Sequence, residues 1–116
     1  MRQDPDVATL PPSLATFMRP WLEVVRVATP GMGEEVRSEA ENVSAHLRYR
    51  LMMTAPLETM LEDAEVASRK LALTLDLRHA LPARARADAL NKLQNLIVWL
   101  QGAKPNARTK ALGLGW

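Results

Sequence analysis

Apolar residues recur at helical spacing along most of this chain, and prolines and glycines interrupt the pattern at a few places. Short breaks between long amphipathic segments favour antiparallel packing of neighbouring helices. The sequence has no strand-like alternation of useful length, no internal repeat and no low-complexity tract. We therefore expect one all-α domain over residues 1–116, folded as an antiparallel three- to four-helix bundle.

The first helical segment follows a proline-rich, irregular lead-in, residues 1–12. Ser13 stands in a good N-cap position at the start of this segment. Pro20 interrupts it, so either a short helix ends near Arg19 and a new one begins at Pro20, or a single helix kinks there. The run from Thr29 to Gly33 is a clear stop.

Three further helices are predicted over about residues 33–54, 57–80 and 83–101, followed by a basic tail without periodicity, residues 102–116. The third helix carries apolar stripes on two opposite sides, which predicts that it is sandwiched between neighbours. The second of these stripes consists of Val66, Leu73, Leu77 and Leu81. The fourth helix is predicted to bury Ala89, Leu90, Leu93, Leu96, Ile97 and Leu100.

The absence of cysteine excludes disulfides, thiolate nucleophiles and cysteine-based metal sites. The first residues, Met-Arg-Gln-Asp-Pro-Asp, are unlike a signal or transit peptide. No apolar run approaches the length of a membrane span. We therefore expect a soluble, cytoplasmic protein that does not contact a membrane.

No motif indicates a reaction or a cofactor. The four serines lack the context of a nucleophile elbow, and no glycine-rich phosphate loop occurs. Two groups of side chains have spacings that could ligate a metal: Glu35, Glu39, Asn42 and His46 in the second helix, and Asp76 with His79 in the third. Solvated polar flanks are the more common explanation of such groups. We expect no enzyme activity, no cofactor and no bound metal.

Charge is split along the chain. Residues 34–65 carry eight acids and three bases, a net of −5, whereas residues 66–116 carry two acids and nine bases, a net of +7. Such an asymmetry suggests a basic surface facing an acidic partner. If the helices pack antiparallel, however, the start of the second helix and the turn near Pro82 lie at the same end. Part of the split would then be internal charge complementarity.

The basic residues around the turn near Pro82 and in the tail are the predicted nucleic-acid contacts: Arg69, Lys70, Arg78, Arg84, Arg86, Lys92, Lys104, Arg108 and Lys110. Lysine and arginine at a turn and in an arm suit phosphate contacts, which bring affinity without base specificity. Such residues also solubilise helix faces and complement helix C-termini, which is the competing explanation. This stretch lacks stacking aromatics, which argues against a sequence-specific single-strand binder.

Apolar residues separated by glycines end the chain: Leu112, Leu114 and Trp116. Tryptophan is an efficient anchor for docking, so these residues are predicted to contact the chain's own core or a partner. A frayed terminus is the alternative.

These features together favour a non-catalytic helical subunit of a larger nucleoprotein assembly. It would contact nucleic-acid backbone through its basic end and partner subunits through apolar faces. In size, helical content and polarity the chain is similar to the small helical subunits of CRISPR effector complexes, a similarity of type that assigns no residue. The alternatives are a protein-binding adaptor or phage- or plasmid-type inhibitor, a small DNA-binding regulator, and a bundle enzyme or metal protein built on His46 or His79. A homo-oligomer is compatible with each.

Overall fold

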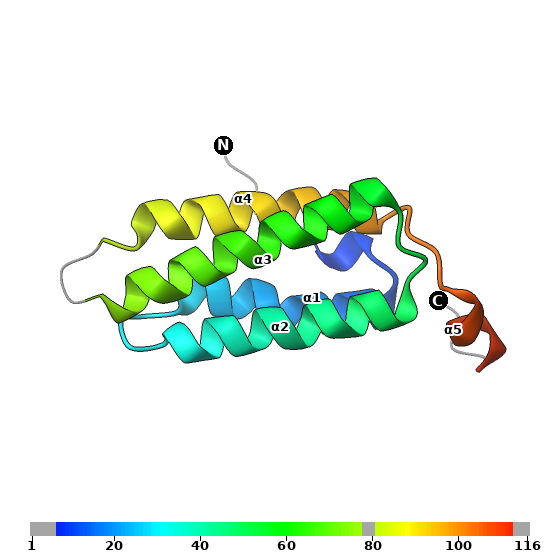
Figure 1. Ribbon diagram of the computed structural model, residues 1–116, viewed down its shortest axis with the longest axis horizontal. Coiled ribbons are helices and arrows are strands. Elements are labelled where there is room, and N and C mark those ends of the chain that lie inside the picture. Colours follow the sequence, from blue (N-terminus) through cyan, green and yellow to red (C-terminus); the bar gives the residue numbers. More distant parts are fainter. Residues whose placement is uncertain (1–6, 78–80, 113–116) are drawn as a thin grey trace.

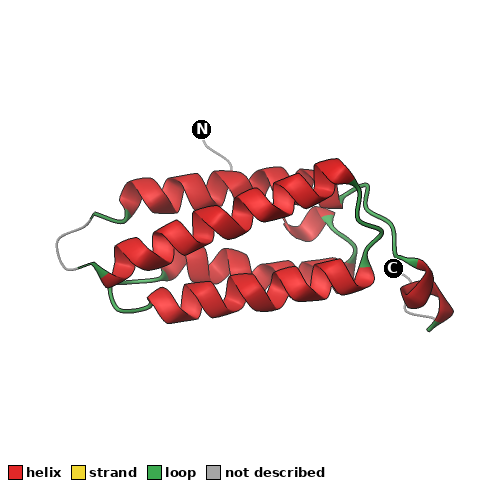
Figure 2. Ribbon diagram, viewed as in Figure 1, coloured by secondary structure: helices red, strands yellow, loops and turns green. Residues whose placement is uncertain are grey.

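The computed structural model describes residues 7–77 and 81–112, and these ranges contain helices and loops without a β-sheet (Figures 1 and 2). The elements are a 3-10 turn η1 (Val7–Thr9) and the helices α1 (Pro12–Val27), α2 (Gly33–Arg50), α3 (Ala55–Asp76), α4 (Ala83–Leu100) and α5 (Ala107–Ala111). The four long helices pack as an antiparallel bundle, which confirms the predicted fold class.

Each long helix contacts two neighbours around the bundle. α1 packs on α2 and α4, and α3 packs on the same two helices from the other side. The C-termini of α1 and α3 therefore lie beside the N-termini of α2 and α4, and we call this the loop end (Figure 1, left). The opposite end, where α5 lies, is the tail end (Figure 1, right).

The core is built mainly from leucine, alanine and valine, as the scarcity of aromatic residues requires. Trp21 of α1 is the largest fully buried side chain, and its indole N–H donates a hydrogen bond of 2.9 Å to the buried Ser68 hydroxyl of α3. This bond satisfies a donor that would be costly to bury alone. All six residues predicted to be buried in α4 are buried.

α1 differs from the prediction at both of its prolines. The helix begins at Pro12, whose fixed φ suits the first turn, and no side chain caps it. Ser13 is therefore not the N-cap, and its hydroxyl has no hydrogen-bond partner among the described residues. The helix continues through Pro20 without ending near Arg19. Pro20 and Thr16, whose carbonyl loses its usual donor at Pro20, are both exposed, so water can replace that donor.

α2 ends at Arg50, four residues before the predicted end at Thr54. Leu51 turns to an extended conformation, and the Met52 N–H donates to the Lys104 carbonyl at 2.9 Å. Thr54 instead caps α3, because its hydroxyl accepts a hydrogen bond from the Leu57 N–H. The tail therefore bonds to a backbone group that would otherwise bond within a further turn of α2.

The loop end is held by a glycine and by α3. Gly31 has φ of +94°, a left-handed conformation that favours glycine, and its N–H donates to the Leu75 carbonyl at 3.1 Å. α3 ends at Asp76, where Leu77 is extended, and not at Ala80. Residues 78–80 lie outside the described residues.

The sandwich predicted for α3 is wrong. Val66, Leu73 and Leu77 are 40%, 60% and 61% exposed, and Leu81 beyond the helix is 86% exposed. α2 and α4 both pack on the other stripe of α3, and no described helix covers the outward side. α3 therefore presents an unpartnered apolar stripe to solvent.

The predicted irregular segments at the two ends contain more structure than expected. Leu10 of the lead-in is buried in the core beside η1. The tail forms α5, and Leu51 and Pro105 pair through an isolated bridge. No described helix is long and apolar enough to cross a membrane.

Candidate nucleic-acid interface

The tail is fastened to the C-terminus of α2, where a helix leaves carbonyls without intrahelical donors. The Asn106 N–H and the Thr109 hydroxyl each donate to the Arg50 carbonyl at 2.9 Å. The Asn106 side-chain amide donates to the Tyr49 carbonyl at 2.6 Å. The same side chain caps α5 by accepting from the Thr109 N–H at 2.9 Å. One asparagine therefore joins the two helices and fixes where the basic tail lies.

This docking assembles cations and an aromatic ring from segments more than fifty positions apart in the sequence. We call the group the basic–aromatic cluster, and it consists of Tyr49, Arg50, Lys104, Arg108 and Lys110. The Arg108 guanidinium lies over the Tyr49 ring, 4.5 Å from its centroid. The Tyr49 side chain nonetheless stays 56% exposed. The cluster thus combines positive charge with an accessible aromatic surface.

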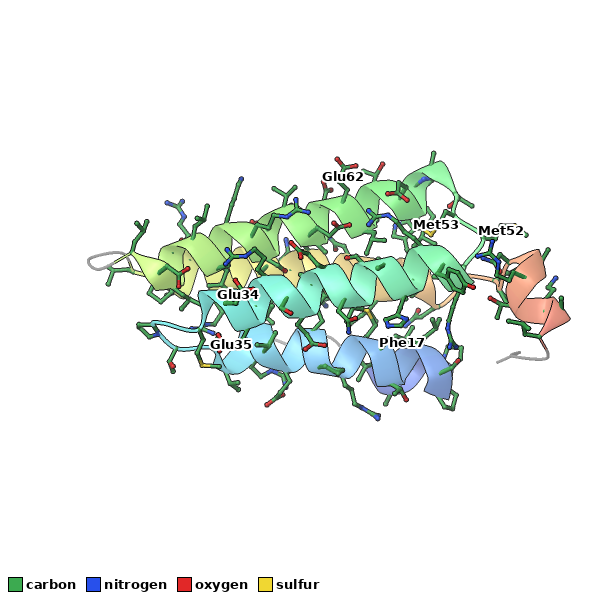
Figure 3. The ribbon with its side chains drawn as sticks, turned by 60° about the horizontal axis from the view of Figure 1, so that its bottom comes forward. Phe17, Glu34, Glu35, Met52, Met53 and Glu62 are labelled. Carbon is green, nitrogen blue, oxygen red and sulfur yellow. The ribbon has the colours of Figure 1, made fainter. Side chains whose placement is uncertain are left out.

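Arg50 is held by a second stack behind the cluster. Its guanidinium lies 4.9 Å from the centroid of the Phe17 ring, which stacks on His46 with a centroid distance of 5.0 Å and an interplanar angle of 16°. Figure 3 shows Phe17 of α1 beside α2 at this end of the bundle. Stacking orients the guanidinium without neutralising it. Arg50 therefore keeps its positive charge available to an anion.

The cations of the cluster have no acidic partner in the described part of the chain. Within residues 7–77 and 81–112, no ion pair joins Arg50, Lys104, Arg108 or Lys110 to a carboxylate. Glu58, an acid at the same end, is itself engaged by Arg48 at 2.8 Å. The described cations of the cluster therefore stay available to an anion.

Arg86, one of the predicted nucleic-acid contacts, is instead bonded within the protein. It donates to three carbonyls of the last turn of α1, at 2.7 Å to Val25, 3.1 Å to Arg26 and 2.6 Å to Ala28. A guanidinium at a helix C-terminus satisfies orphan carbonyls and complements the helix dipole. Arg86 therefore joins α4 to α1, as the competing explanation of the basic residues expects.

Arg69 is likewise engaged inside the protein, in a network that joins α2 to α3. Glu65 is 7% exposed, and it pairs with Arg69 at 3.2 Å and with Arg48 at 2.5 Å. The hydrogen bond from Arg48 to Glu58 raises the pKa of the Arg48 guanidinium, and its pairing with Glu65 acts in the same direction. Here acids of the acidic stretch neutralise bases, so part of the charge split is internal complementarity.

Three further predicted contacts, Lys70, Arg84 and Lys92, lie on α3 and α4. Lys70 and Arg84 line a shallow hollow between α3 and α4 that also holds Asp88. Lys92 is half-buried on α4. Glu34 and Glu35 lie at the loop end (Figure 3, left), with Asp76 beside them on α3. Asp88 partly offsets the charge of Lys70 and Arg84, so the loop end is less basic than the sequence count indicates.

Four predicted site residues remain, of which the structure describes Leu112 alone. Arg78, Leu114 and Trp116 lie outside the described residues. Leu112 follows α5 and is 63% exposed.

The metal candidates are not gathered into a site in the described part of the chain. No group of three or more histidine, cysteine, aspartate and glutamate side chains there could hold a metal ion. His46 lies against the Phe17 ring, and His79 is outside the described residues. We find no arrangement of catalytic groups among the described residues.

Sequence reasoning missed Tyr49 and Arg50, because both fall within the net-negative stretch. The available signal was local: Arg48-Tyr49-Arg50 precedes the break before Pro56 and so marks a basic helix C-terminus. Comparison with known proteins adds nothing to this geometry, since no protein-family model, curated protein or solved structure matches the chain.

Proposed function

We propose that the protein is a non-catalytic helical subunit of a larger nucleoprotein assembly and that its basic–aromatic cluster binds nucleic-acid backbone. One observation carries this proposal: the tail that bears Lys104, Arg108 and Lys110 is docked on the C-terminus of α2, where Arg50 lies, and none of these four cations pairs with a carboxylate among the described residues. Unpaired cations on one surface attract phosphates and bind them with little base specificity.

The preferred ligand is single-stranded nucleic acid. Tyr49 is 56% exposed beside the cations, and an exposed ring next to positive charge suits the stacking of an unpaired base. A base inside a duplex cannot stack on such a ring. The cluster therefore has the two features, charge and an aromatic surface, that single-strand binding uses.

A small DNA-binding regulator that uses α3 and α4 as a helix-turn-helix motif is less well supported. Its two helices cross at about 90–120°. α3 and α4 instead lie side by side and antiparallel along their length (Figure 1). A protein adaptor that meets an acidic protein surface through the same cations is the second candidate, because the exposed stripe on α3 suits contact with protein.

Fluorescence anisotropy with labelled single-stranded and duplex oligonucleotides at low salt tests the proposal. The double variant Lys104→Glu/Lys110→Glu should weaken single-strand binding about tenfold or more, because two phosphate contacts become repulsive. The matched control Arg19→Glu/Arg84→Glu makes the same change of charge on exposed residues elsewhere, and it should bind within about threefold of wild type.

A third variant separates stacking from charge. Tyr49→Ala should weaken single-strand binding by about tenfold and leave duplex binding nearly unchanged. Wild-type protein that binds neither oligonucleotide at low salt would refute the proposal. Capture of one partner protein whether or not nuclease is added would then favour the adaptor.

A further inference from the structure

The outward side of α3 is an apolar surface that no described helix covers. Val66, Leu73 and Leu77 lie on it at 40–61% exposure, and Leu81 follows beyond the helix end. Exposed apolar side chains that share one side of a helix are candidates for an interaction surface. We call these four residues the α3 stripe.

Charged residues flank the α3 stripe on both sides, and on each side the sign of the charge changes from negative to positive along the helix. At 100° per residue, Glu62 and Arg69 fall on its α2 side, where Arg69 pairs with Glu65 of the α2–α3 network. Asp63 and Lys70 fall on its α4 side, where Lys70 lines the hollow shared with α4. Figure 3 shows Glu62 pointing away from the bundle. On each side an acid stands two helical turns before a base.

We propose that the α3 stripe is a homodimer interface, in which α3 packs antiparallel against α3 of a second copy about a two-fold axis near Val66. Such an axis sets the α2 side of one stripe against the α2 side of the other, and likewise the two α4 sides. The two α3 helices then run in opposite directions. Glu62 then faces the partner's Arg69, and Asp63 faces the partner's Lys70. Glu62 and Arg69 are centred in the sequence half a residue before Val66, and Asp63 and Lys70 half a residue after it. One register therefore brings both pairs together.

The charge pattern selects this orientation over the parallel one. A parallel pairing in register would place Glu62 and Asp63 against the same acids, and Arg69 and Lys70 against the same bases. Like charges facing each other across an interface are destabilising. Antiparallel packing instead gives each acid an opposite charge, and symmetry repeats every pair, which is the property of a self-complementary two-fold interface.

This dimer does not depend on nucleic acid, so it and the proposed function can fail separately. Sedimentation of the full chain without nucleic acid at about 100 μM, well above the Kd of a micromolar dimer, should give twice the chain mass of 12.9 kDa. A wild-type monomer at this concentration would overturn the proposal and leave the stripe to a different protein.

Charge reversal tests the pairing directly. Glu62→Lys/Asp63→Lys makes both flanks wholly basic, and Arg69→Glu/Lys70→Glu makes them wholly acidic. Each variant alone should sediment as a monomer, whereas their equimolar mixture should form a heterodimer in which all four pairs are restored. Circular dichroism confirms that both variants keep their helical content. A mixture that stays monomeric, or a single variant that dimerises as wild type does, contradicts the register.

The absence of cysteine permits a second test by cross-linking. Val66→Cys places one thiol beside the axis, so mild oxidation should yield a disulfide-linked dimer. Leu73→Cys lies on the same stripe, but its two copies are about 21 Å apart in the antiparallel register, far beyond the reach of a disulfide. It should therefore not link. Linking of both variants would indicate a parallel dimer, and linking of neither would exclude the axis near Val66; each result overturns the proposal.

Discussion

Replacing Arg86 with alanine should destabilise the fold strongly, although Arg86 is one of the basic residues first assigned to nucleic acid. Its guanidinium donates to three α1 carbonyls, of which the bonds to Val25 and Ala28 are partly buried, at 2.7 and 2.6 Å. A hydrogen bond from a charged donor contributes about 1.5–3 kcal/mol, and water replaces part of it when the site is partly open. We expect Arg86→Ala to lower the free energy of unfolding by about 3 kcal/mol.

Urea unfolding followed by far-ultraviolet circular dichroism measures this loss, and thermal unfolding should show a fall in Tm of about 10 °C for a chain of this size. The control is Arg84→Ala, which removes an exposed arginine from the same turn of α4 and should change stability by less than about 0.5 kcal/mol. Arg86→Lys should recover part of the loss, because one ammonium cannot reach all three carbonyls. An Arg86→Ala protein within about 1 kcal/mol of wild type would refute the assignment of Arg86 as a helix cap.

Two further predictions concern the core and the tail. Ser68→Ala should lower stability by about 1–3 kcal/mol in urea unfolding, because it leaves the buried Trp21 indole N–H without an acceptor. Ser44→Ala is its matched control and should be neutral or stabilising, since the buried Ser44 hydroxyl has no hydrogen-bond partner among the described residues; equal losses for the two variants would contradict this account. Asn106→Ala should release the tail from Tyr49, which would appear as faster trypsin cleavage after Arg108 and Lys110 and weaker single-strand binding at unchanged core stability. An unaltered cleavage rate would show that other contacts suffice to hold the tail.

The bundle itself could be predicted because its signals are local. A proline and a glycine delimit α4, and a single apolar stripe defines its buried side, so every residue predicted to be buried there is buried. Helix ends are harder to predict where distant segments compete for the same backbone groups. α2 ends at Arg50 because the tail takes the Met52 N–H and the Arg50 carbonyl, and residue spacing carries no trace of that competition.

The α3 stripe shows a limit of periodicity. Spacing identifies which residues share a side of a helix, but it does not say whether another helix covers that side. Val66, Leu73 and Leu77 have the spacing of a core and the exposure of a surface. Whether another helix covers them depends on how many helices the chain supplies. α2 and α4 both pack on the other stripe of α3.

The candidate site was predictable only in part, for a similar reason. Counting charges along the chain found Lys104, Arg108 and Lys110 but placed Arg50 in an acidic stretch. Asn106 of the tail donates hydrogen bonds to the Tyr49 and Arg50 carbonyls. A count of charges along the sequence cannot detect this tertiary contact. α5 is five residues long, too short for a periodic signal, and its only marker in the sequence is the asparagine cap.

The salt dependence of single-strand affinity tests most directly whether the basic–aromatic cluster binds phosphates. Each phosphate contact contributes about −0.7 to the slope of log K against log salt on a single strand. Four engaged cations therefore predict a slope of about −3 for wild type, and Lys104→Glu/Lys110→Glu should reduce it to about half. The Arg19→Glu/Arg84→Glu control should keep the wild-type slope. Equal slopes for the three proteins, or a reduced slope in the control alone, would contradict the account.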